Sequence, residues 1–274
     1  MNGLRDVIGL GVAGNFTGHL EQAGEAGDFT AVKVKDPGAP KGVFPFYVPA
    51  GGEHFLHRYP LGSERIAPAP DGGSLQLEPE LGLLCELRYD GQRVAEIVPT
   101  AFGAYNDCSI RREGATKISQ KKNWGADSKG VSETLLPIDR FEPGGVLDHY
   151  RIACLLVRRG EVHAYGIDSP VSGYTYFYGQ LLDWLLERMN GQRDEGPLED
   201  IARWLQVAGQ PRRALISVGA TRYTPFGEEN FLQAGDDACV LVYDSRRHSL
   251  DELSRSLPGE IAPREGLSLL RQRV

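Results

Sequence analysis

Short strand-like segments joined by tight turns make up much of this chain. Two segments have apolar and polar residues in alternation, or β-branched residues, on both sides of a central glycine. They are residues 82–99 (GLLCELRYDGQRVAEIVP) and 150–167 (YRIACLLVRRGEVHAYGI). Two such runs around Asp-Gly or Arg-Gly predict β-hairpins. Residues 213–221 and 237–244 predict further strands by the same criteria.

Only two segments predict convincing helices. Residues 178–192 place four leucines on one face, with Gly191 as a stop. Residues 196–209 repeat this pattern, with Pro197 near the start and Gly209 past the end. The 34 glycines and 17 prolines divide the rest of the chain into short segments, which favours strands and turns over long helices.

A glycine pattern near the N-terminus suggests a dinucleotide-binding unit. Gly9, Gly11 and Gly14 spell G-x-G-x-x-G after a short apolar run, and Asp36 closes a later alternating stretch, residues 27–36. A doubly wound domain, however, needs strands that alternate with helices on both sheet faces. The only helix that can follow these glycines, over about residues 17–26, contains two more glycines that weaken it. The pattern by itself therefore does not identify a nicotinamide or flavin enzyme.

Composition excludes several classes of protein. The chain has 274 residues, of which 41% are hydrophobic, so it can bury a core and is not a disordered protein. Its net charge of −7 argues against nucleic acid or an anionic membrane as partner. No apolar run approaches the roughly 18 residues that a membrane span needs. The four cysteines are scattered without a C-x-x-C pair, which is typical of reduced thiols in a cytoplasmic protein.

A set of three acidic residues indicates function more strongly than the glycine pattern does. Glu78 and Glu80 lie two positions apart, so in an extended segment both side chains leave the same face. Asp107 follows beyond a hairpin that can bring it back to them. Three carboxylates suit a hard divalent ion such as Mg²⁺, Mn²⁺ or Ca²⁺. From spacing alone, the pair can equally be the exposed face of an edge strand.

Four motifs in order resemble the fumarylacetoacetate hydrolase superfamily. They are EPELGLL, NDCSIR, SKG and GATRYTPFG…FLQAGD, and the resemblance covers roughly residues 12–243. It implies an α+β, mainly β fold, a β-roll of mixed sheets with few helices. It also implies one domain over residues 1–274, with a loop-rich part and possible lid at 1–70, a metal-binding β core at 71–245 and a C-terminal tail at 246–274. Members of the family usually form homodimers.

The resemblance also assigns site residues. It implies a divalent-metal site at Glu78, Glu80 and Asp107. Arg111 and Thr221 match substrate-binding positions, and Lys129 matches the active-site lysine. The neighbouring Lys121 and Lys122 are expected in a solvated loop.

The N-terminal segment NFTGHLEQ resembles the family's N-Y-x-x-H-x-x-E segment. Asn15, Phe16 and His19 stand in register, and the family's histidine pairs with the glutamate to activate a water. Here Gln22 occupies the glutamate position and the nearest carboxylate is Glu21. We expect His19 and Glu21 to be catalytic, on a substrate-closing segment whose flanking glycines make it easy to move. A threonine at position 17 can cap a short helix there.

The function that the resemblance implies is hydrolysis of a C–C bond in a small dicarbonyl or acylpyruvate-type acid, with a divalent cation. Decarboxylation, dehydration or isomerisation of a small keto acid at the same metal site is an alternative. So is a non-catalytic small-molecule binder, because Gln22 and Val48 replace family residues.

Overall fold

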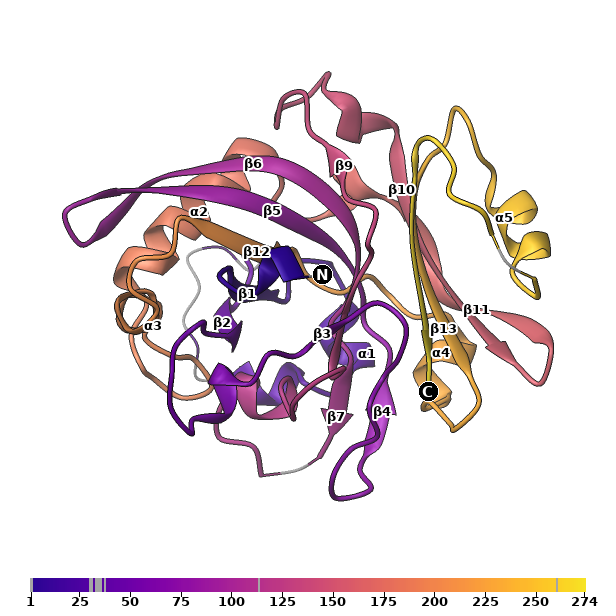
Figure 1. Cartoon of the computed structure of the whole chain (residues 1–274), viewed down its shortest axis with the longest axis horizontal. Helices are drawn as coiled ribbons and strands as arrows, with labels where there is room; N and C mark the ends of the chain where they lie inside the picture. Colours follow the sequence, from indigo (N-terminus) through magenta and orange to yellow (C-terminus); the bar gives the residue numbers. More distant parts are fainter. Residues whose placement is uncertain (1, 30–31, 33–35, 37, 113, 260) are drawn as a thin grey trace.

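The computed structural model describes residues 2–29, 32, 36, 38–112, 114–259 and 261–274. Its strands form two main sheets and a small two-stranded one (Figure 1). The larger sheet has the order β2-β1-β12-β5-β6-β8-β3, with β9 paired to β6. Its strands are β1 (Ile8–Ala13), β2 (Gly42–Tyr47), β3 (Leu61–Gly62), β5 (Pro79–Asp90), β6 (Arg93–Asn106), β8 (Lys129–Val131), β9 (Leu136–Pro137) and β12 (Arg213–Ser217).

The second sheet has the order β11-β10-β13-β14. Its strands are β10 (Tyr150–Arg158), β11 (Glu161–Pro170), β13 (Asp237–Asp244) and β14 (Leu267–Arg273), and the small sheet pairs β4 (Ser74–Gln76) with β7 (Ser109–Arg111). The α-helices are α1 (His19–Gln22), α2 (Tyr178–Gly191), α3 (Ile201–Val207), α4 (Pro225–Glu229) and α5 (Leu250–Ser256). Short 3-10 helices cover Asn2–Leu4, Ala26–Phe29, Phe55–His57, Ile118–Lys121 (η4), Val146–His149 and Val171–Gly173.

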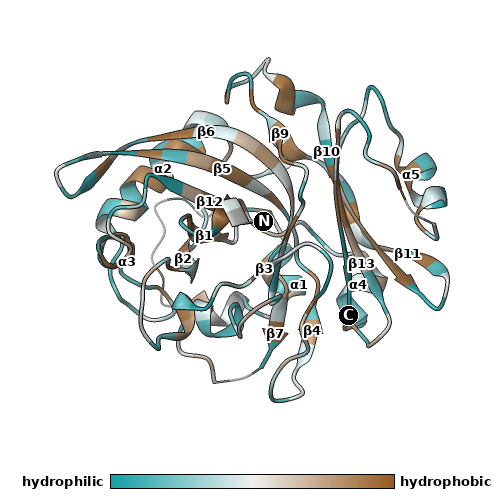
Figure 2. Cartoon of the chain, viewed as in Figure 1, coloured by the Kyte–Doolittle hydropathy of each residue, from teal (hydrophilic) through white to brown (hydrophobic). Residues whose placement is uncertain are grey.

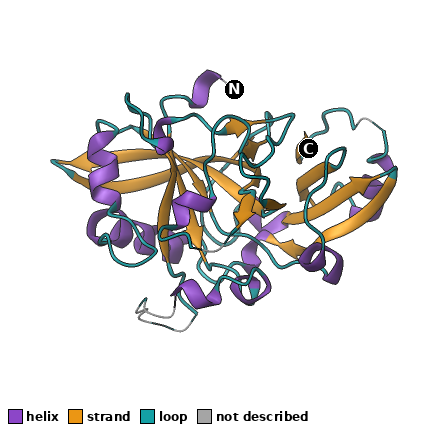
Figure 3. Cartoon of the chain, turned by 90° about the horizontal axis from the view of Figure 1, so that it is seen from below, coloured by secondary structure: helices purple, strands orange, loops and turns teal. Residues whose placement is uncertain are grey.

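The predicted mainly β class with mixed sheets and few helices is confirmed. Both hairpins form where expected, with Asp90 paired to Arg93 and Arg158 paired to Glu161 across two-residue turns. The larger sheet is mixed because β1 and β12 run parallel, as do β3 and β8. Seen from below, the strands form two groups and the helices lie around them (Figure 3).

The core joins the two sheets and α2. Hydrophobic residues follow the strands of both sheets in Figure 2. Leu83 on β5, Phe102 on β6, Ile152 on β10 and Val240 on β13 are all fully buried in one cluster with Leu185 of α2. Burial of such side chains contributes roughly 1.5–3 kcal/mol each to folding.

Several local predictions are corrected. The helix expected at 196–209 begins only at Ile201, because the preceding residues bind other segments and Asp200 accepts the N–H of Arg203 as the cap. Helix α1 follows Gly18 in the left-handed region without a side-chain cap, so Thr17 does not cap it. The expected C-terminal tail contains α5 and β14, and β14 pairs with β13 along its length. Of the strand expected at 27–36, the first residues belong to a 3-10 helix and most of the others lie outside the described residues.

The glycines of the G-x-G-x-x-G pattern have a packing role. Gly9 and Gly11 lie inside the buried strand β1 and not in a loop before a helix. A Cβ at Gly9 would lie 2.1 Å from the Phe46 ring, and one at Gly11 would lie 2.2 Å from the Phe44 ring. These two glycines therefore leave space for aromatic rings of β2 and do not form a flexible flank. The left-handed glycines beside α1 are Gly14, Gly18 and Gly24.

We expect Gly11→Ala to lower the free energy of unfolding by about 1–3 kcal/mol, because the added methyl overpacks the Phe44 ring. The measurement is urea unfolding of the purified protein. Gly179→Ala is the control, since Gly179 lies in α2 with open space around its Cβ. Because Gly179 is the second residue of the helix, that change should stabilise the protein by less than about 1 kcal/mol. Equal stability of Gly11→Ala and wild type would contradict the packing role.

Candidate active site

Three carboxylates meet at one end of the β5–β6 hairpin. Glu78 directly precedes β5, Glu80 lies on it, and Asp107 directly follows β6, so antiparallel pairing brings them together. The Asn106 side-chain oxygen accepts the N–H groups of Glu78 and Cys108, which ties the two strand ends. The three side chains each offer a ligand oxygen within 4.8 Å of the others, and all are buried. We call Glu78, Glu80 and Asp107 the acid triad.

A small cavity adjoins the acid triad. Its volume is about 20 Å³, which is room for roughly one water-sized particle. His19, Glu25 and Lys122 also line it, together with apolar residues that include Phe44. The acid triad is thus buried among partly apolar residues, an environment in which charge interactions are strong.

Two buried lysines partly neutralise the acid triad. The Lys122 ammonium lies 2.7 Å from Glu78 Oε2 and 2.5 Å from Asp107 Oδ2. Lys129 Nζ lies 3.6 Å from Asp107 Oδ1 and also donates to the backbone oxygens of Asp107 and Cys108. The expectation that Lys122 lies in a solvated loop is wrong, because this residue is only 3% exposed. No local feature of the sequence separates Lys122 from Lys121; the turn of η4 decides which one points inward.

Arg111 ties the acid triad to three side chains that the sequence did not single out. Its Nη2 lies 2.7 Å from Glu78 Oε1, and its Nη1 lies 2.7 Å from Glu25 Oε1. Its Nε donates to Gln76, and Nη2 also donates to the Tyr223 hydroxyl. No local pattern in the sequence distinguishes Glu25. It lies three residues after Gln22, which occupies the position of the family's glutamate.

The electrostatics leave two acids of the triad poorly compensated. Burial would raise the pKa of Glu78, but the charges of Lys122 and Arg111 outweigh it and hold that pKa below its usual value. Burial and the charge of Asp107 raise the pKa of Glu80 well above normal. Burial also raises the pKa of Asp107, against the opposing effect of Lys122.

These residues fit a divalent cation. Both carboxylate oxygens of Asp107 face lysine ammonium groups, and among the described residues no other group donates to them. Glu80 uses one oxygen to accept the N–H of Gly219. Both oxygens of Glu78 accept hydrogen bonds, from Arg111 and from Lys122. Three buried carboxylates are still the kind of donor set that Mg²⁺, Mn²⁺ or Ca²⁺ prefers.

His19 lines the cavity, and its surroundings favour the neutral imidazole. It is 4% exposed, and its Nδ1 lies 3.0 Å from the Thr221 backbone oxygen. A carbonyl oxygen only accepts, so Nδ1 carries the proton and Nε2 keeps its lone pair. Burial lowers the pKa of His19, which favours this neutral form at pH 7. Thr221 contributes this carbonyl, while Ala220 lines the cavity.

The segment around His19 differs from the expected arrangement of acids. The side chain of Gln22 donates to the Tyr223 backbone oxygen and accepts the Tyr223 N–H, so it holds α1 in place. Glu21 is exposed and is not among the described residues that line the cavity. Glu25 is the carboxylate from this segment that reaches the cavity.

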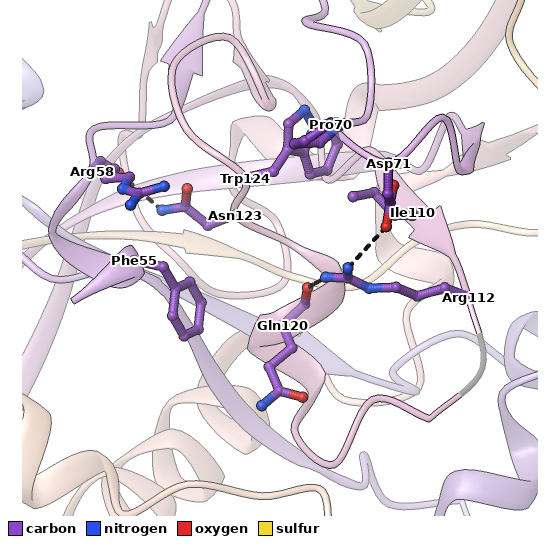
Figure 4. Close-up of a pocket in the computed structure, with 9 residues that line it drawn as sticks. All are labelled: Phe55, Arg58, Pro70, Asp71, Ile110, Arg112, Gln120, Asn123 and Trp124. Carbon is purple, nitrogen blue, oxygen red and sulfur yellow. Dashed lines mark hydrogen bonds and ion pairs between the residues drawn. The ribbon is translucent and has the colours of Figure 1, made fainter. Parts of the chain in front are cut away.

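A second, more open pocket lies nearby (Figure 4). Its volume is about 370 Å³, and Figure 4 shows Arg112 directed toward Asp71 and the Gln120 backbone at one side. Trp124 lines this pocket, and the Lys129 ammonium lies 5.2 Å from the centre of the Trp124 ring. Trp124 therefore lines the second pocket and also contacts Lys129, which faces Asp107 of the acid triad.

The chain matches the model of one known protein family. Residues 25–274 match the family DUF5718, described as a family of unknown function. The chain belongs to this family. No curated protein matches this DUF5718 member.

Solved structures of similar fold come from the fumarylacetoacetate hydrolase family and related enzymes. A Yersinia pestis CO92 protein described as a fumarylacetoacetate hydrolase family member superposes with a TM-score of 0.54 at 14% identity, over 98% of this chain and 93% of that one. A 5-carboxymethyl-2-hydroxymuconate delta-isomerase from Mycobacterium smegmatis gives 0.51 at 13% identity, over 97% and 77%. A 2-keto-3-deoxyarabinonate dehydratase gives 0.51 at 14% identity, over 97% and 72%. The predicted fumarylacetoacetate hydrolase-like fold is thereby confirmed.

Within the part of the chain that the structure describes, no helix is both long enough and apolar enough to cross a bilayer.

Proposed function

We propose that this protein is an enzyme that acts on a small keto or dicarbonyl acid, with a divalent cation held by Glu78, Glu80 and Asp107. The observation that carries the proposal is the convergence of these three buried carboxylates, two of which lack adequate compensation. A cation bound there would polarise a carbonyl oxygen and stabilise an enolate. We put hydrolysis of a C–C bond in an acylpyruvate-type acid first.

The residues of the chain itself supply the other requirements of hydrolysis. His19 lines a cavity that admits about one water, and Nε2 is the ring nitrogen that the bond to Thr221 leaves unprotonated. This atom can accept a proton from that water as a general base. The buried Lys129 faces Oδ1 of Asp107, whereas Lys122 contacts Oδ2, and Lys129 can balance negative charge that develops on the substrate. Arg111 is the proposed contact for the substrate carboxylate.

A second candidate is a reaction that needs no activated water, such as decarboxylation, dehydration or isomerisation of a keto acid. The observation that favours it is the partner of His19, which is a backbone carbonyl and not a carboxylate. The names of the similar structures include an isomerase and a dehydratase, so the same fold accommodates both reaction types. The homodimer and the cytoplasmic location expected from the sequence remain part of the proposal.

The test is a turnover assay of the purified chain with acylpyruvates and oxaloacetate, in the presence of Mg²⁺ or Mn²⁺. We expect turnover that a chelator abolishes and added metal restores. The product separates the candidates, since hydrolysis releases a carboxylic acid and pyruvate whereas decarboxylation releases CO₂. Thermal stabilisation by these acids without turnover would support a binder and contradict the enzyme.

A further inference from the structure

Lys122 pairs with two of the three carboxylates of the acid triad. Its ammonium contacts both Glu78 and Asp107 within 2.7 Å, and it is buried. The Phe44 ring lies beneath it, with 5.4 Å from Nζ to the ring centre. The oxygens that Lys122 engages are among those that a bound cation would use.

The position of Lys122 is held from outside the site. It follows η4, whose first residue Ile118 donates its N–H to the Pro197 oxygen, while the Ser119 hydroxyl donates to the Glu199 carboxylate. Lys117 Nζ donates to the backbone oxygens of Gly196 and Leu198. The connection between α2 and α3 therefore anchors the turn that carries Lys122.

The residue after Lys122 is anchored as well. The Asn123 amide donates to the backbone oxygens of Phe46 and Arg58, at 2.8 and 2.9 Å. Gln192, at the end of α2, bonds Val43 in both directions and so holds β2, the strand that carries Phe44. Anchors on both sides make Lys122 a built part of the site and not a surface side chain that has folded inward.

We propose that Lys122 is an internal counter-ion of the acid triad, and that a divalent cation must displace it from Glu78 and Asp107 in order to bind. This inference rests on the function proposed above, because it concerns the same cation. A buried ammonium and a divalent cation on the same oxygens repel each other strongly in a low-dielectric site. Lys122 therefore lowers the affinity of the acid triad for the cation and stabilises the triad when no cation is bound.

The test compares Mn²⁺ affinity of the wild-type chain with that of Lys122→Gln, by titration calorimetry and by electron paramagnetic resonance of free Mn²⁺. We expect the variant to bind Mn²⁺ about tenfold more tightly. Substitutions of residues that contact metal ligands typically change metal affinity by about 10–100-fold. Without metal, the variant should melt at a lower temperature than wild type, because buried carboxylates have lost their partner. Mn²⁺ should then raise its melting temperature more than it raises that of wild type.

Lys121→Gln is the matched control. Lys121 is the adjacent lysine and pairs with Glu25 at 3.6 Å, outside the acid triad. Its Mn²⁺ affinity should equal that of wild type. Ser119→Ala is a second variant that keeps the Lys122 charge but removes an anchor of η4, so it should fold and bind Mn²⁺ about threefold more tightly, within the range of one lost hydrogen bond.

The outcomes separate this inference from the proposed function. Equal or weaker Mn²⁺ binding by Lys122→Gln, with measurable binding by wild type, overturns the counter-ion role and leaves the metal site standing. Unchanged affinity in Ser119→Ala overturns it as well if Lys122→Gln does not fold. Absence of Mn²⁺ binding in wild type, in Lys122→Gln and in Ser119→Ala overturns the inference together with the proposed metal dependence.

Discussion

His19→Ala is expected to lower the rate of C–C bond hydrolysis by ~10²–10⁴-fold, the usual contribution of a general base. The structure gives the reason, since Nδ1 is committed to the Thr221 oxygen and Nε2 is the only ring nitrogen left to accept a proton. Metal affinity should stay unchanged, because His19 is not part of the acid triad. The measurement is steady-state turnover at saturating metal, with Mn²⁺ titration of the same sample.

The pH dependence gives an independent check on His19. Because burial lowers the pKa of His19, the histidine is protonated only below the usual value of about 6.5. A base works when it is unprotonated, so kcat/KM should fall on the acid side through a pKa below that value, and this limb should vanish in His19→Ala. Glu21→Gln is the control from the same turn, and its turnover should match wild type because Glu21 is exposed. Hydrolysis at the wild-type rate by metal-loaded His19→Ala would exclude the hydrolase mechanism and leave decarboxylation, which needs no activated water.

Glu80→Gln is expected to weaken Mn²⁺ binding by about 100-fold or more. Loss of a residue that only hydrogen-bonds a metal ligand already costs about 10–100-fold in metal affinity, and loss of a ligand itself should cost at least as much. The substitution removes one charge of the acid triad, while the amide oxygen can still accept the N–H of Gly219. Metal-dependent turnover should be lost with it. Calorimetric titration with Mn²⁺ measures the affinity directly.

Although Glu80→Gln weakens metal binding, it should stabilise the metal-free protein. The pKa of Glu80 is raised in the folded state by burial and by Asp107, so its ionised form destabilises the fold, and this loss grows as pH rises above the pKa of an unfolded glutamate. Metal-free Glu80→Gln should therefore melt at a higher temperature than wild type at pH 8, with little difference at pH 4. Glu86→Gln, an exposed position on the same strand, should change neither property. Mn²⁺ affinity of Glu80→Gln equal to that of wild type would remove Glu80 from the metal site.

Local patterns in the sequence determined the elements of the fold. Alternation around Asp90-Gly91 and Arg159-Gly160 predicted both hairpins, because side-chain direction along a strand depends only on position in the strand. The same rule placed Glu78 and Glu80 on one face, and the hairpin between them and Asp107 brought the third carboxylate back. Order and spacing of four motifs indicated the fold that the structural comparisons confirm.

Tertiary structure alone decided which of several chemically equal residues enter the site. Lys122 and not Lys121 reaches the acid triad, since η4 is anchored by residues some 80 positions away. Glu25 and not Glu21 reaches the cavity, through its pairing with Arg111. Gly9 and Gly11 face aromatic rings of a strand that pairs with theirs more than 30 positions later. In each case the deciding contact joins segments far apart in the chain, and its partners are set by sheet pairing and packing, which no local pattern of residue types encodes.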